Sequence, residues 1–358
     1  MSQPDRSYIS RISELTLADR PLAGGKSASL GELTRAGVKV PPGFVVMTPA
    51  FDEFLHVAGV GAEIRNEIES LDLDDATQVA AASERIRQSI GELPVPQEIG
   101  DAICSNYREM SLNGAGCPVA VRSSATCEDS ESASFAGLQD TYLWVRGEEQ
   151  LVDSVRSCWA SIYNSESITY RRRLDFPEEQ ISMAVVVQEM IDAICAGVMF
   201  TRSPTTGDKS VVVIEGSWGL GSSLVSGEVT PDHFVVNKVT GEINKRDISD
   251  KAVEHTADPS GSGVREQAID DERRRAPCLS DESIAELWKI ARTVEQHYAA
   301  PQDIEWAICR DPETGENEIS LLQSRPETVW ATREVEPAAK PSAKAFDHVL
   351  DLLSKRKN

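Results

Sequence analysis

Three side chains near the end of the chain have the types and spacing of a metal–phosphate site. Residues 303–325 read as two strands joined by a turn centred near Thr314. That turn places Glu305 opposite Gln323, with Arg325 beside them. Mg²⁺ takes oxygen ligands and a guanidinium binds phosphate oxygens, so this patch suits a metal-bound nucleotide. The alternative is an ordinary surface Glu–Arg ion pair.

Successive side chains of a strand point to opposite faces, and this alternation predicts which residues share a face in each of the two strands. Glu305 and Ala307 share one face of the first strand, and hydrophobic residues occupy the other face. On the second strand the same rule puts four residues on one face, namely Ile319, Leu321, Gln323 and Arg325.

A second cation, Arg122, ends a predicted strand and is followed by a run of hydroxyls. An Arg fork can hold two phosphate oxygens while hydroxyl and backbone N–H groups bind the others. Residues 134–141, which include Gly137 and Thr141, have the small side chains of a loop able to cover a phosphate chain. The alternative is a strand–loop–strand unit with a solvent-facing Arg122.

The segment Gly24–Gly25–Lys26–Ser27 offers a third cation at the start of a helix. A Walker A loop would need glycine at position 20, where Arg20 stands, so we exclude a P-loop. Two interpretations of this segment remain. In one, a glycine turn presents Lys26 and a helix N-terminus to an anion; in the other, Lys26 is an ordinary surface lysine at the start of a helix.

The elements that must position these groups change character along the chain. The first third is mainly helical, and strand patterns dominate from residue 117. Ser280 caps a predicted helix with one apolar face. Residues 255–277 are small, polar and charged, which indicates a mobile insert, and 331–345 read as a linker before a short amphipathic segment.

Composition limits the function further. The 358 residues hold 36 Lys+Arg and 58 Asp+Glu, a net charge of −22, which disfavours nucleic acid and anionic membranes as partners. Seven cysteines without a CxxC pair indicate reduced thiols. No signal peptide or membrane-spanning run is recognisable, so we expect a cytoplasmic protein.

Five segments taken together identify a family resemblance that covers residues 8–330. They are GGKSASLGEL (24–33), VAVRSSATCEDSESASFAGLQDTYL (119–143), MAVVVQEMIDAICAGVMFTRSPTTGD (183–208), EGSWGLGSSLVSGEVTPDHFVV (215–236) and DIEWAI with LLQSRPETVW (303–330). The chain resembles the nucleotide-binding domain of phosphoenolpyruvate synthase, pyruvate phosphate dikinase and rifampicin phosphotransferase.

The resemblance implies an α+β, ATP-grasp-like fold of two lobes, 1–187 and 188–330, followed by a linker and short helical tail over 331–358. It implies ATP and Mg²⁺ as ligands, with Lys26, Arg122 and Arg325 as catalytic phosphate-binding residues and Glu305 and Gln323 as metal ligands. The loop with Gly137 and Thr141 would close over the phosphates. Adenine would be held by Gln188, Glu189 and Met190.

The resemblance also implies a phosphoryl relay through a histidine. Single-chain members continue into a domain with a Thr/Ser-Gly-Gly…His segment, which these 358 residues lack. We therefore expect a separate partner subunit that carries the phosphohistidine and binds a small-molecule acceptor. The ATP-binding subunit of phenylphosphate synthase is our leading specific interpretation, with phenol as acceptor and AMP and Pi as products.

Three alternatives remain open at this stage. A split phosphoenolpyruvate synthase or an antibiotic phosphotransferase component would use the same ATP chemistry on another acceptor. A nucleotide-binding regulatory subunit would transfer nothing. The complete phosphate-and-metal set argues against it, because such a subunit need not retain all of these residues: Lys26, Arg122, Glu305, Gln323 and Arg325. An ATP-grasp ligase would require a carboxylate pocket, for which the sequence shows no motif.

Overall fold

The computed structural model describes residues 7–110, 116–126, 140–261, 263–311 and 314–330. The chain divides into two compact units, 1–327 and 328–358, and the account below concerns the first. The predicted linker and helical tail over 331–358 lie outside the described residues.

The first sheet has five strands in the order β1-β2-β5-β3-β4, and each neighbouring pair is antiparallel. The strands are β1 (Ile9–Arg11), β2 (Gly43–Val46), β5 (Met183–Glu189), β3 (Val119–Ala125) and β4 (Thr141–Val145). β3 and β5 are buried along almost their whole length because both faces of the sheet are covered.

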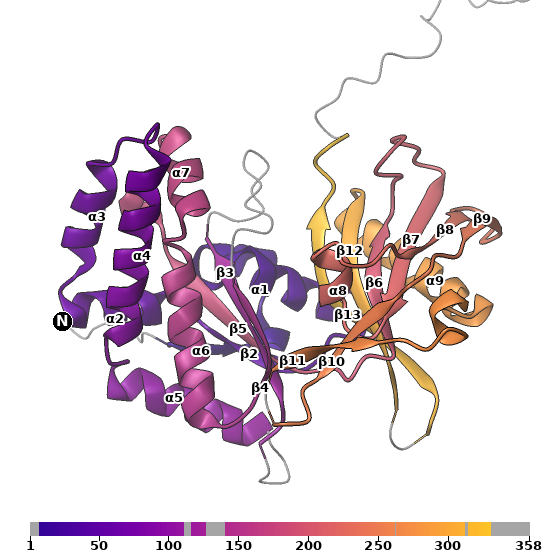
Figure 1. Cartoon of the computed structure of the whole chain (residues 1–358), viewed down its shortest axis with the longest axis horizontal. Helices are drawn as coiled ribbons and strands as arrows, with labels where there is room; N and C mark the ends of the chain where they lie inside the picture. The colour runs from indigo at the N-terminus through magenta and orange to yellow at the C-terminus, as the bar shows by residue number, and fades with distance from the viewer. Residues whose placement is uncertain (1–6, 111–115, 127–139, 262, 312–313, 331–358) are drawn as a thin grey trace, which may run out of the picture. The chain divides into compact units, whose positions relative to one another are not determined.

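Six helices lie on one face of this sheet and share a hydrophobic core with it (Figure 1). They are α2 (Thr48–Ala58), α3 (Gly61–Glu69), α4 (Ala76–Glu92), α5 (Gln97–Met110), α6 (Glu148–Ser161) and α7 (Ser165–Arg173). Alternate residues such as Val121 and Val187 join this helical core, which contains the buried Trp159. Asp75 and Asn164 cap α4 and α7 by accepting backbone N–H bonds.

The other face of the first sheet meets α1 (Arg20–Arg35) and a second core. Short 3₁₀ turns, η1 (Ile12–Glu14) and η2 (Leu17–Asp19), lead into α1, and η3 (Glu178–Gln180) leads into β5. Val45 and Val186 point to this side, together with Leu30 of α1. Arg122 is paired with Val186 in the β3–β5 ladder, so its side chain leaves β3 on this same face.

The second sheet has six antiparallel strands in the order β13-β12-β6-β7-β8-β9. They are β13 (Asn317–Pro326), β12 (Gln302–Arg310), β6 (Cys195–Phe200), β7 (Val211–Trp218), β8 (Asp232–Asn237) and β9 (Ile243–Asp247). Helix α9 (Asp281–Tyr298) covers one face, and Ser280 caps it by accepting from Ser283 N, as predicted. Ile304 and Trp306 pack in this core.

The prediction of a mobile insert at 255–277 is wrong, because the structure has a β-hairpin in this part of the chain. Strands β10 (Val253–Ala257) and β11 (Val264–Ala268) form a two-stranded sheet, and η4 (Arg273–Arg275) follows. The pairing satisfies the backbone of this polar segment without apolar side chains, so composition alone did not reveal it. A short helix, α8 (Ser222–Val225), packs beside β10.

The structure confirms the α+β class, with antiparallel sheets and separate helices. None of the helices in the described part of the chain is long and apolar enough to cross a membrane. Six of the seven cysteines lie in described residues, and all six are free thiols.

Candidate functional site

Arg122 of the first sheet reaches the second sheet and joins the two predicted metal ligands. Its Nη2 donates to Glu305 Oε2 at 3.0 Å and to Gln323 Oε1 at 2.8 Å. Its Nη1 donates to the carbonyl of Leu322 at 2.7 Å. The Arg122 side chain is 12% exposed and that of Glu305 is 38% exposed, so the cluster is open to solvent on the Glu305 side.

The predicted register of the β12–β13 hairpin is confirmed where it matters for the site. Glu305 is paired with Gln323, and Asp303 with Arg325. Because cross-strand partners share a face, the four polar side chains lie together on the face opposite to Ile304 and Trp306.

The prediction that Leu321 shares a face with Gln323 is wrong, because a β-bulge interrupts the ladder. Trp306 is paired with Leu321 rather than with Leu322, which has no partner in the register. The extra residue turns Leu321 into the core and Gln323 toward Glu305. The bulged Leu322 offers its carbonyl to Arg122, so the irregularity itself helps to build the site.

Asp303 is a site residue that the sequence reasoning missed. It faces Arg325, with Oδ2 at 3.5 Å from Arg325 Nε. Burial raises the pKa of the Asp303 carboxyl to about 6, although the Arg325 charge acts in the opposite direction and Glu327 adds to the rise. Its position two residues before Glu305 was the available signal, because residues i and i+2 of a strand share a face.

The segment that carries Lys26 is fixed to β3 beside Arg122. Gly24 interrupts α1 with φ 74° and ψ 170°, and a Cβ at this position would lie 2.1 Å from the Ser124 carbonyl oxygen. Ser124 Oγ donates to the Ala23 carbonyl at 3.0 Å and accepts from Ser27 N at 3.2 Å. Ser124 is two residues beyond Arg122, so Lys26 stands at the start of a helix segment anchored to the same strand.

The loop predicted to cover the phosphates is described only at its end. Thr141 is exposed at the start of β4 and pairs with Arg122 in the β3–β4 ladder. Gly137 lies outside the described residues. The β3–β4 ladder therefore places Thr141 next to Arg122 within the first sheet.

The stretch predicted to hold adenine ends β5, on the strand next to Arg122. Gln188 is buried, and its Nε2 donates to the Pro41 carbonyl at 3.0 Å. Glu189 N donates to Pro42 O, and Met190 N donates to Pro118 O, each at 2.9 Å. These three bonds tie the end of β5 to the neighbouring segments at 41–42 and 118.

The polar face of the second sheet continues beyond Glu305. Across the ladders Glu305 pairs with Val198, Val198 with Glu215, and Glu215 with His233. His233 Nδ1 lies 3.1 Å from Glu215 Oε1. This row places a second acidic group on the side of the sheet that carries the candidate site.

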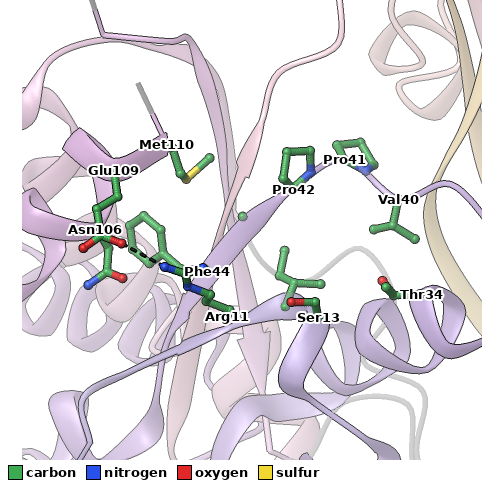
Figure 2. Close-up of a pocket in the computed structure, with 12 residues that line it drawn as sticks. Arg11, Ser13, Thr34, Val40, Pro41, Pro42, Phe44, Asn106, Glu109 and Met110 are labelled. Carbon is green, nitrogen blue, oxygen red and sulfur yellow. Dashed lines mark hydrogen bonds and ion pairs between the residues drawn. The ribbon is translucent and has the colours of Figure 1, made fainter. Parts of the chain in front are cut away.

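A cavity of about 310 Å³ is lined in part by Pro41, Pro42 and Phe44 (Figure 2). Arg11, Asn106 and Glu109 lie at one end of it, and Val40 and Thr34 at the other. Arg11 pairs with Glu109 at 3.0 Å, so its charge is already balanced. None of the predicted site residues in the described ranges lines this cavity, and the cluster around Arg122 remains the candidate site.

Comparison with known proteins gives a clear family match. The family described as pyruvate phosphate dikinase, AMP/ATP-binding domain, matches residues 20–345. A probable phosphoenolpyruvate synthase of Methanothermobacter thermautotrophicus is 42% identical over 333 residues, which cover 92% of this chain and 47% of that protein. The phosphoenolpyruvate synthase of Aeropyrum pernix is 41% identical over 363 residues, covering 94% of this chain and 44% of that protein.

A third relative, the phosphoenolpyruvate synthase of Pyrococcus furiosus, is 36% identical over 360 residues, which cover 90% of this chain and 44% of that protein. The chain thus spans about half the length of these curated relatives. Among solved structures, PH1788 from Pyrococcus horikoshii Ot3 is weakly similar, with TM-score 0.33 and 15% identity over 75% of this chain and 97% of that one.

Proposed function

The chain belongs to the pyruvate phosphate dikinase AMP/ATP-binding domain family, and on this premise we propose that it binds magnesium-ATP between its two sheets and transfers the diphosphoryl group of that ATP to a histidine. The observation that carries the proposal is the cluster in which Arg122 meets Glu305 and Gln323. It combines a phosphate-binding cation with oxygen donors for a metal, the two requirements of phosphoryl transfer.

The phosphate chain would be held by cations from both sheets. Arg122 comes from β3 of the first sheet and Lys26 from α1, whereas Arg325 comes from β13 of the second sheet. Thr141, beside Arg122, would contribute a hydroxyl, and the loop with Gly137 would cover the phosphates. Positive groups fixed on opposite sides of a polyphosphate stabilise the charge that develops during transfer.

The residues present fit a magnesium ion. Glu305 contributes a carboxylate and Gln323 an amide oxygen, and both oxygens already converge on one cationic group, Arg122 Nη2. Mg²⁺ prefers such oxygen donors and retains waters and phosphate oxygens in its shell. When bound, the ion would neutralise phosphate charge and orient the chain, and Asp303 would add acidic charge nearby.

We further propose an ATP-grasp-like arrangement of two lobes, with the division at residues 187–188. Two separate sheets support this proposal, together with a helical core that belongs to the first sheet and contains no residue of the second. Glu189 ends β5, the last strand of the first sheet, so Gln188, Glu189 and Met190 lie where the chain passes to the second sheet. Adenine held there would place its phosphates along β3 toward Arg122.

The histidine that accepts the diphosphoryl group is proposed to belong to a partner subunit. Each of the four histidines in described residues lies within ion-pair distance of a carboxylate: His56, His233, His255 and His297. A neighbouring negative charge disfavours approach of a polyphosphate. Attack of the partner histidine on the β-phosphorus of ATP would release AMP, and water would then remove the outer phosphate as Pi.

Phosphoenolpyruvate is favoured over phenylphosphate as the final product. The relatives compared above carry the name phosphoenolpyruvate synthase, whereas the phenylphosphate synthase interpretation rests on architecture alone. Pyruvate would then accept the phosphoryl group from the histidine.

Isotope labelling tests this proposal directly. The chain, purified from its native cells with its associated proteins, is incubated with Mg²⁺ and ATP labelled at either the β or the γ phosphate. We expect AMP, γ label in Pi and β label on a histidine, discharged by pyruvate into phosphoenolpyruvate. Discharge by phenol instead would restore the phenylphosphate interpretation. ATP binding without any AMP would favour a regulatory subunit.

A further inference from the structure

Three potential metal ligands converge away from the Arg122 cluster, where the glycine-rich segment 215–236 meets the β10–β11 hairpin. They are Glu228, His255 and Glu266, and their nearest ligand atoms all lie within 4.8 Å of one another. The proposed ATP chemistry uses none of the three. They come from three different positions in the fold: the turn after α8, β10 and β11.

The imidazole of His255 is held at both nitrogens. Its Nε2 lies 2.8 Å from Glu228 Oε2, and its Nδ1 lies 2.8 Å from Ser222 Oγ. The His255 side chain is 15% exposed, so it has little freedom to turn away. A hydrogen bond to the second ring nitrogen is the usual support of a metal-binding histidine, because it fixes the ring and its tautomer.

Backbone contacts position the imidazole independently of the three side chains. The carbonyl of His255 accepts from Leu220 N at 3.0 Å, and Gly219 forms an isolated bridge with His255. Gly219 has φ 71°, and a Cβ there would lie 2.5 Å from the His255 carbonyl oxygen. The glycine-rich segment can approach β10 this closely because position 219 lacks a side chain. Glu266 is then set opposite His255 by the β10–β11 ladder.

We propose that Glu228, His255 and Glu266 bind a divalent transition-metal ion of the zinc or manganese class. One imidazole and two carboxylates form a donor set that such ions accept, whereas Mg²⁺ prefers oxygen donors alone. With neutral His255 the set carries two negative charges, which a divalent ion balances. Zinc–ligand distances are about 2.0–2.2 Å, so the ligand atoms would draw closer by small side-chain rotations, and water would complete the shell.

The ion would link the glycine-rich segment to both strands of the β10–β11 hairpin. At the other end of the hairpin, Gly263 N donates to the Trp144 carbonyl of β4 at 3.2 Å. β10 is thus attached to the glycine-rich segment, while the hairpin tip touches the first sheet. Metal bound at His255 would stabilise this connection without taking part in phosphoryl transfer.

Metal titration without nucleotide tests the site. The full chain, stripped with EDTA and dialysed, is titrated with ZnCl₂ and with MnCl₂ in a calorimeter. We expect one tight site per chain, a higher melting temperature with metal, and at least tenfold weaker binding in His255→Ala and Glu266→Gln. Ser222→Ala should weaken binding less than either ligand variant does.

Two controls separate this site from others. His56→Ala removes an exposed histidine on α2, and Glu305→Gln alters the proposed magnesium site; both should bind zinc as the parent does. Glu266 is exposed, so Glu266→Gln should fold normally. If His255→Ala fails to fold, the result for Glu266→Gln decides the test. No binding by the parent, or equal binding by Glu266→Gln, would overturn the proposal, whatever the outcome of the ATP-labelling experiment.

Discussion

Arg122 and Glu305 are 183 positions apart in the sequence, yet Arg122 Nη2 donates to Glu305 Oε2 at 3.0 Å. The bond joins β3 of the first sheet to β12 of the second. Together with the bonds to Gln323 and Leu322, it accounts for three of the five guanidinium N–H donors. Phosphate oxygens would therefore bind the remaining donors or replace these contacts, which couples nucleotide binding to the contact between the sheets.

Removing the guanidinium tests that coupling. Arg122→Ala should abolish AMP formation and weaken ATP binding roughly 10- to 100-fold, because each charge-assisted hydrogen bond contributes about 1.5–3 kcal/mol. Adenosine binding, which uses other groups, should change much less. Isothermal titration with ATP and with adenosine measures both. Arg11→Ala is the matched control, because Arg11 is exposed and paired with Glu109; normal turnover in Arg122→Ala would remove its assigned role.

Replacing Glu305 distinguishes a metal ligand from a partner of Arg122 alone. Glu305→Ala should raise the Kd of magnesium-ATP at least tenfold, a loss of about 1.4 kcal/mol, and leave the Kd of free ATP in EDTA nearly unchanged. Titrations with and without Mg²⁺ provide the comparison. Glu318→Ala, near the far end of the same hairpin, should bind both forms normally. An equal loss for both forms of ATP would argue against metal ligation by Glu305.

Two glycines with similar φ values test the anchoring of the Lys26 segment. Gly24 and Gly37 have φ +74° and +76°, but only at Gly24 would an added Cβ meet other atoms, 2.1 Å from Ser124 O. Gly37→Ala should therefore cost only the strain of the backbone, about 1 kcal/mol. Gly24→Ala should cost roughly 2–4 kcal/mol, because overpacking is added and because φ 74° with ψ 170° is a conformation that essentially only glycine adopts. Urea unfolding measures the difference; equal costs would show that the Ser124 contact does not constrain α1.

The raised pKa of Asp303 predicts a pH-dependent stability. A carboxyl with pKa about 6 in the fold and a lower one in the unfolded chain keeps more protons when folded, so stability falls as pH rises from about 4 to 6. Asp303→Asn lacks this decline. Its free energy of unfolding should equal that of the parent near pH 4 and exceed it above pH 6, by about 3 kcal/mol at most. Denaturant unfolding at both pH values checks this, and a difference independent of pH would contradict the assigned pKa.

Local patterns were sufficient to predict several elements correctly. The cap at Ser280, the apolar face of α9 and the pairing of Glu305 with Gln323 each depend on residues close in sequence, through helical spacing, strand alternation and turn position. The same local reasoning failed at 255–277, where backbone pairing rather than composition decides the structure.

The sequence by itself thus determined the family, the α+β class and the types of residue available for phosphate and metal. The tertiary structure decided how they combine. The bulge at Leu322 separates Leu321 from Gln323, and Arg122 crosses from one sheet to the other to meet both Glu305 and the bulged carbonyl. The Arg122 contact leaves no local pattern, because it joins residues of two sheets that are 200 positions apart in the sequence. The bulge lies within one hairpin, but strand alternation assumes an unbroken ladder and therefore does not indicate it.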